Sequence, residues 1–83
     1  MPDTNGKWRS GPERKRIAWL KAHPRLAEVP TDREDVGEAQ SALLGEMYTE
    51  ALTVGLYSKS TKAADVRWGI RIVAGLIKRG VVA

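Results

Sequence analysis

The chain contains no cysteine and a single histidine, His23, among its 83 residues. Without cysteine, disulfide bonds and thiolate metal sites are excluded. One imidazole cannot form a histidine-based metal site without carboxylates or a second subunit, and it has no cysteine or second histidine with which to build a nucleophile–base pair. His23 directly precedes Pro24 at an expected helix end. We therefore interpret it as a surface or capping residue rather than a catalytic base.

The sequence also lacks a glycine-rich phosphate loop. Gly69, Gly75 and Gly80 lie in or just after an expected helix, at a spacing unsuited to such a loop. A core this small leaves little room for an enclosed substrate pocket. Several carboxylates cluster where a helix is expected to begin, and the positive helix end already explains them: Asp32, Glu34, Asp35 and Glu38. We therefore expect no enzymatic activity, no cofactor and no metal.

Long apolar runs are missing as well. No stretch approaches the roughly 20 residues that a membrane-spanning helix needs. The first residues are polar and lack the apolar centre of a signal peptide. We expect a cytoplasmic protein without a membrane partner. A chain of this size without disulfides or metal is often stabilised by association, which favours a homo-oligomer or an obligate partner.

The charges that are present fall into three blocks of alternating sign. Residues 1–29 hold seven cations and three anions, residues 30–54 one cation and six anions, and residues 55–83 six cations and one anion. The net charge is +4. Sorted charge of this kind produces a field that a polyanion can feel, and it also suits head-to-tail contacts between copies.

Apolar periodicity and capping residues predict an all-α fold: one domain of three helices, residues 11–83, preceded by a flexible basic arm, residues 1–10. The first helix is expected over residues 12–22, because Pro24 disfavours helical geometry in the residue before it. Residues 25–29 are expected to form a connector that Leu26 and Val29 anchor to the core.

The second helix is expected to begin at a capping box, Thr31-Asp32-Arg33-Glu34, and to stop at Gly55. The third is expected to begin near Ser60 or Thr61 and to stop at Gly80. The basic triplet Arg14-Lys15-Arg16 can face the acidic second helix and pair with Glu46 or Glu50.

The third helix presents three faces at 100° per residue. Its main apolar stripe, expected to be buried, consists of Ala63, Val66, Ile70, Val73 and Ile77. Beside it lies a basic ridge of Arg67, Arg71 and Lys78. A second apolar stripe, Trp68, Ile72 and Leu76, is either packed inside a central helix or is an oligomer or partner interface. Gly69 lies between the two apolar stripes and would permit close approach by another backbone.

The basic residues have two interpretations. They can form a solvated helix face and a solubilising tail, or they can bind phosphates. In the second case Ser58, Ser60 and Thr61 at the start of the helix would add hydroxyl donors to the backbone N–H groups there. The candidate nucleic-acid-binding residues are Lys59, Lys62, Arg67, Arg71 and Lys78, with Lys7, Arg9, Arg14, Lys15 and Arg16 adding nonspecific affinity.

The order helix, turn, basic helix over residues 38–79 resembles the helix-turn-helix family, and the compact chain without cysteine looks like the small accessory proteins of bacteriophages. The resemblance implies that the last helix binds duplex DNA. We therefore expect a small nucleic-acid-binding protein. The alternative is a protein-interaction module without DNA binding, such as a phage virion component or an inhibitor of a host protein. In that case the Trp68 stripe and the N-terminal arm would bind a protein, and the basic ridge would either keep the chain soluble or dock an acidic protein surface.

Overall fold

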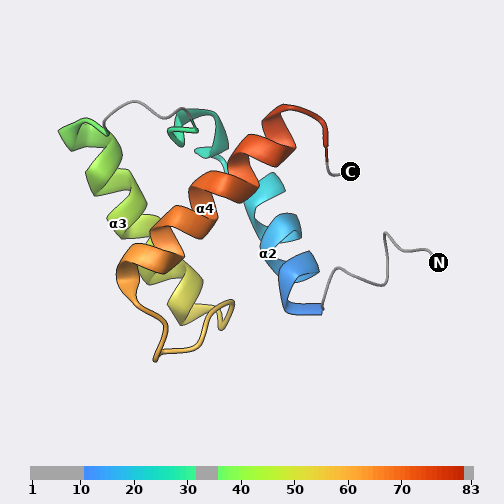
Figure 1. Ribbon diagram of the computed structural model, residues 1–83, viewed down its shortest axis with the longest axis vertical. Coiled ribbons are helices and arrows are strands. Elements are labelled where there is room, and N and C mark those ends of the chain that lie inside the picture. The colour runs from blue at the N-terminus through green and yellow to red at the C-terminus, as the bar shows by residue number, and fades with distance from the viewer. Residues whose placement is uncertain (1–10, 32–35, 82–83) are drawn as a thin grey trace.

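The computed structural model describes residues 11–31 and 36–81, and within them the chain is all-α (Figure 1). It forms α2 (Gly11–Lys21), the short 3₁₀ helix η1 (Leu26–Glu28), α3 (Glu38–Thr53) and α4 (Ala63–Lys78). These segments contain no strand. The three predicted helices are thus confirmed, whereas the predicted arm, residues 1–10, lies outside the described residues.

Helix α4 is the central element of the fold. It crosses in front of α2 and α3 in Figure 1 and packs against both of them. Its buried residues are Val66, Ile70, Ala74 and Gly75. Val73 and Ile77 are partly buried against the same core. The predicted inward stripe is therefore confirmed at its centre, and the opposite side of α4 faces away from the other helices.

The core collects apolar side chains from every described element. Helix α2 contributes Leu20, the connector contributes Val29, and α3 contributes Leu43, Leu44 and Met47, all at most 4% exposed. Burying one side chain of this size stabilises a fold by roughly 1.5–3 kcal/mol relative to leaving it in water. Leu26 packs against this cluster from η1, so both predicted anchors of the connector are confirmed.

Helices α3 and α4 both end just before the glycines that were expected to stop them, Gly55 and Gly80. Gly55 and Gly80 have φ angles of +79° and +74°, the left-handed region in which a side chain is strained. After α3, the Leu56 amide donates to the carbonyl of Ala51, and after α4 the Val81 amide donates to that of Leu76, each at 2.9 Å. These bonds satisfy helix-end carbonyls in the Schellman pattern.

The predicted start of the second helix is wrong. Helix α3 begins at Glu38, and Gly37 precedes it with extended backbone, φ −74° and ψ 173°. The Gly37 amide donates to the Gln40 side chain at 3.3 Å, which replaces the expected cap at Thr31. Val36 packs against the core without joining the helix. The remainder of the expected capping box, residues 32–34, lies outside the described residues.

Candidate nucleic-acid interface and the outward face of α4

The loop before α4 presents two exposed cations, Lys59 and Lys62. The hydroxyls of Ser58 and Ser60 lie 2.8 Å apart and bond to each other, and the Thr61 amide donates to the Ser58 carbonyl at 2.9 Å. The serine hydroxyls therefore brace the loop. The side chains of both lysines have no polar partner among the described residues, and their charges face solvent beside the positive end of the helix.

Of the expected basic ridge, Arg67 is exposed and its guanidinium has no polar partner within the described segments. Arg71 is placed differently. Its Nε donates to the carbonyl oxygen of Pro30 at 2.9 Å, and its guanidinium carbon lies 5.2 Å from the centre of the Trp68 ring. Arg71 therefore ties α4 to the connector, which the wheel positions of the sequence did not reveal.

Lys78 also bonds to the connector. Its Nζ donates to the carbonyl oxygens of Ala27 and Val29 at 3.2 Å and 2.8 Å. These carbonyls close η1, where no helical partner continues the hydrogen-bond pattern. The ridge is thus divided: Arg67 remains available to a ligand, whereas Arg71 and Lys78 neutralise carbonyl dipoles within the fold.

The basic triplet of α2 is divided in the same way. Arg14 and Lys15 are exposed. Arg16 donates from Nε to the Leu56 carbonyl at 2.7 Å, and its guanidinium lies 4.0 Å above the centre of the Tyr57 ring. Burial raises the pKa of Tyr57 above its ordinary value of 10.0, and the charge of Arg16 partly lowers it again. Lys7 and Arg9 lie outside the described residues.

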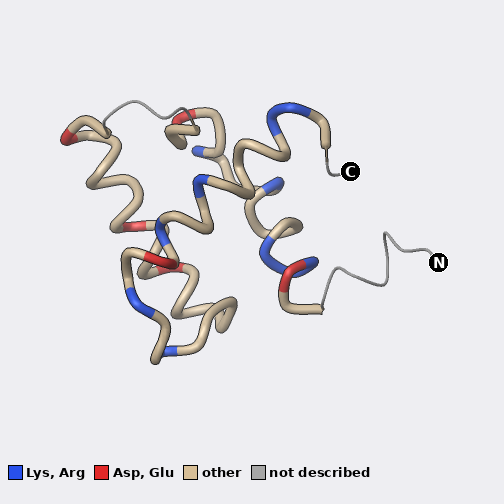
Figure 2. The backbone as a smooth tube through the Cα atoms, viewed as in Figure 1, with Lys and Arg blue, Asp and Glu red and all other residues tan. Residues whose placement is uncertain are grey.

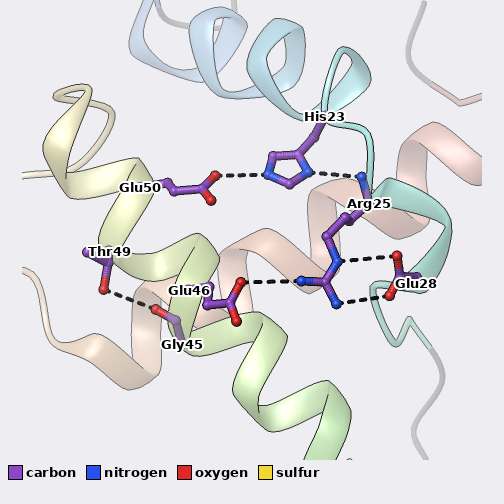
Figure 3. A network of polar contacts seen from close by, with 7 residues as sticks. All are labelled: His23, Arg25, Glu28, Gly45, Glu46, Thr49 and Glu50. Atoms are coloured by element: carbon purple, nitrogen blue, oxygen red, sulfur yellow. Dashed lines mark hydrogen bonds and ion pairs between the residues drawn. The ribbon is translucent and has the colours of Figure 1, made fainter.

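The carboxylates of α3 face the connector rather than the basic triplet. Glu50 accepts from Nε2 of His23 at 2.9 Å, and Glu46 accepts from Arg25 at 3.2 Å (Figure 3). The expected pairing of the triplet with these two glutamates is therefore wrong. The reason is the path of the chain. The segment that follows α2 lies beside α3, so its residues His23 and Arg25 reach the two glutamates.

A second bond fixes the orientation of His23. Its Nδ1 accepts the backbone N–H of Arg25 at 3.1 Å, so the neutral ring carries its proton on Nε2 and donates it to Glu50. The side chain is only 9% exposed. His23 thus acts as a structural cap of the connector.

Arg25 joins this network through a two-point contact with Glu28, whose oxygens lie 3.0 and 3.2 Å from the guanidinium nitrogens. This hydrogen bonding raises the pKa of Arg25 and lowers that of Glu28. The spacing of Arg25 and Glu28 was the only sequence signal of the network, since Glu46 and Glu50 come from a distant helix. Figure 2 shows how charge is distributed: α3 carries only acidic residues, whereas α2, the loop and α4 carry mainly basic ones, with Glu13 on α2 and Asp65 on α4 as the acidic exceptions.

The second apolar stripe of α4 lies on the surface. Trp68 is 55% and Ile72 is 47% exposed, and Leu76 is half-buried. Beside Trp68 a groove of about 350 Å³ runs between α4 and the start of α3, lined by Val36, Ser41, Leu44, Ala64, Arg67, Trp68 and Arg71. Gly69, expected to admit a backbone, is approached by the Tyr57 side chain: a Cβ at Gly69 would lie 3.1 Å from its hydroxyl.

Within residues 11–31 and 36–81 no group of three or more His, Asp and Glu side chains is placed to hold a metal ion. The helices of these segments are too short and too polar to cross a membrane. Comparison of the chain with protein-family models, with curated proteins and with solved structures gave no match. The geometry of the chain itself is therefore the basis for assigning a function.

Proposed function

We propose that the protein binds nucleic acid, most favourably duplex DNA, through the loop before α4 and the first turns of that helix. The observation that carries this proposal is which charged side chains have a polar partner within the fold and which do not. Lys59, Lys62 and Arg67 are exposed and unpaired among the described residues. The carboxylates of Glu50 and Glu46 on α3, in contrast, are paired with His23 and Arg25.

The chemistry of this surface suits phosphate rather than base edges. The Lys62 carbonyl accepts the amides of Asp65 and Val66, so the amides of Ala63 and Ala64 remain as helix-end donors. Two lysines beside these donors can follow a phosphate backbone, and Arg67 lies about one turn further along α4. Arg14 and Lys15 on α2, with Lys7 and Arg9 of the N-terminal segment, add sequence-independent attraction.

The proposal assigns no ligand contact to Arg71 or Lys78, because both donate to connector carbonyls. It also expects little direct base reading by the exposed face of α4. Trp68 and Ile72 occupy that face, and they lack the hydrogen-bonding groups that distinguish base pairs in the major groove.

Fluorescence anisotropy with a labelled duplex, measured over a series of salt concentrations, tests this function. Three phosphate contacts predict a slope of about −2.7 for log affinity against log salt, and losing one contact lowers its magnitude by about 0.9. Lys62→Glu is expected to weaken binding about tenfold or more. The matched control is Lys21→Glu, the same charge change at an exposed position at the end of α2.

Equal affinity of the Lys62→Glu and Lys21→Glu proteins would reject the site. The alternative function, a protein-interaction module, has its own signature. A tagged protein would retain a protein partner from cell extract after nuclease treatment, and the wild-type chain would fail to bind duplex at low salt. That pair of results would replace the nucleic-acid proposal.

A further inference from the structure

The outward face of α4 combines apolar side chains with one charge of each sign. At 100° per residue, five side chains fall within an arc of about 80°: Asp65, Trp68, Ile72, Leu76 and Arg79. The arc lies opposite the buried Val66, Ile70 and Ala74, and the buried Gly75, against which Thr31 packs, borders it beside Trp68. Four of the five are exposed and Leu76 is half-buried. Helix α4 packs against α2 and α3, and its residues Val66, Ile70 and Ala74 are the ones buried in the core.

The two charged members are unsatisfied. Asp65 and Arg79 are exposed, and neither side chain has a polar partner in the described parts of the chain. Asp65 is the only anion among residues 55–83. The other described carboxylates beside the connector are paired with His23 or Arg25.

The order of these residues is complementary to itself when reversed. Asp65 lies seven positions before Ile72 and Arg79 seven positions after it, and Trp68 and Leu76 lie four positions before and after it. Seven and four residues are close to two turns and one turn of an α-helix. When two copies of α4 are placed antiparallel with Ile72 at the two-fold axis, each Trp68 meets a Leu76 and each Asp65 meets an Arg79.

We propose that a second copy of this chain covers the outward face of α4, in an antiparallel, two-fold symmetric pair of α4 helices centred on Ile72. A parallel pair would place Asp65 against Asp65 and Arg79 against Arg79, and it would align the helix dipoles unfavourably. The antiparallel pair satisfies all four charges and opposes the dipoles. An isologous contact of this kind closes after two copies and exposes no new face.

The contact is small, because one helix of 16 residues supplies it. It lies below the area of a standard stable interface, about 1,200–2,000 Å². We therefore expect a weak dimer that dissociates on dilution. This inference stands on α4 alone and does not depend on nucleic-acid binding.

Sedimentation equilibrium of the full chain without nucleic acid, from about 1 µM to about 1 mM, tests the pairing. The wild type is expected to pass from 9.1 kDa to twice that mass. Asp65→Arg and Arg79→Glu each place like charges in contact and are expected to weaken the dimer at least tenfold. The double variant Asp65→Arg/Arg79→Glu restores the pairs and the dimer, and so does mixing the two single variants.

Controls separate pairing from folding. Ile72→Glu brings two carboxylates together at the axis and is expected to give a monomer with unchanged helical circular dichroism, since Ile72 is half exposed. Arg67→Glu makes the same charge change as Arg79→Glu outside the arc and is expected to leave the dimer intact.

Three results would overturn the inference. The first is a wild type that remains monomeric throughout, which would assign the face to a different protein or to solvent. The second is an oligomer that Ile72→Glu does not affect. The third is a double variant that stays monomeric like its parents, which would reject the antiparallel register.

Discussion

The ammonium group of Lys78 lies 2.8 Å from the carbonyl oxygen of Val29, so the last turn of α4 holds the end of the connector. Val29 itself is 2% exposed and belongs to the core. A residue that the sequence places on a basic surface ridge therefore fixes the backbone of a core residue. The same helix carries cations that face inward to carbonyls and cations that face outward to solvent.

Replacing Lys78 by Met keeps the length of the side chain and removes the charge and its two hydrogen bonds. We expect a loss of about 1 kcal/mol in the free energy of unfolding, since a charge-assisted bond to a partly buried carbonyl is replaced by incomplete hydration. Urea denaturation measures it. Lys62→Met is the control, because that side chain has no polar partner among the described residues, and an equal loss in both variants would refute the role of Lys78.

The raised pKa of Tyr57 predicts that the fold loses stability at alkaline pH. Its folded pKa is raised, mainly by burial, so the fold prefers the neutral phenol. The stability that the neutral Tyr57 phenol contributes to the fold is complete below its ordinary pKa of 10.0. It is lost as pH rises through the higher pKa of the folded state. Tyr57→Phe keeps the ring under Arg16 and is expected to lose stability less steeply above pH 10 than the wild type. Thermal unfolding as a function of pH measures the difference, and parallel curves for the two proteins would contradict it.

Gly45 and Gly69 are expected to respond differently to replacement by alanine. At Gly45 in α3 a new Cβ meets nothing within 4 Å, whereas at Gly69 it would lie 3.1 Å from the Tyr57 hydroxyl. Alanine is favoured over glycine in a helix by about 1 kcal/mol. Gly45→Ala is expected to gain most of that, and Gly69→Ala little or none, because the ring is held by Arg16. Equal gains in urea denaturation would show that Tyr57 moves without cost.

If both proposals hold, they define a spacing. In an antiparallel α4 pair centred on Ile72 the two Lys62 residues lie about 30 Å apart along the helix axis, close to one turn of B-DNA at about 34 Å. Ile72→Glu should then weaken binding to a duplex of about 24 base pairs more than to one of about 10. Fluorescence anisotropy with the two duplexes tests this, and the same loss on both would separate pairing from DNA binding.

The helices and the inward stripe of α4 were predictable because periodicity reports local geometry. Val66 and Ile70 are buried as their spacing requires, and Gly55 and Gly80 end their helices. The start of α3 was not predictable in the same way. A capping box at Thr31 is a favourable local pattern, but the connector and Val36 are held by tertiary contacts, so the helix begins only at Glu38.

The partners of individual charges were the least predictable feature. The helical wheel groups Arg67, Arg71 and Lys78, but it does not show that the connector passes beside the last two. Likewise, His23 and Arg25 reach Glu50 and Glu46 because the chain folds back past α3. These contacts span 21 residues or more, and only the path of the backbone determines them.

In α4, Arg67 is proposed to bind nucleic acid and Arg71 to hold the connector. The most direct test of these two roles compares Arg67→Gln with Arg71→Gln, two identical changes four residues apart. Duplex affinity at low salt and the melting temperature are measured for each. We predict that Arg67→Gln loses affinity with an unchanged melting temperature, and that Arg71→Gln keeps its affinity but melts earlier, because its bond to Pro30 is lost. The reverse pattern, with affinity following Arg71 and not Arg67, would contradict the proposed interface.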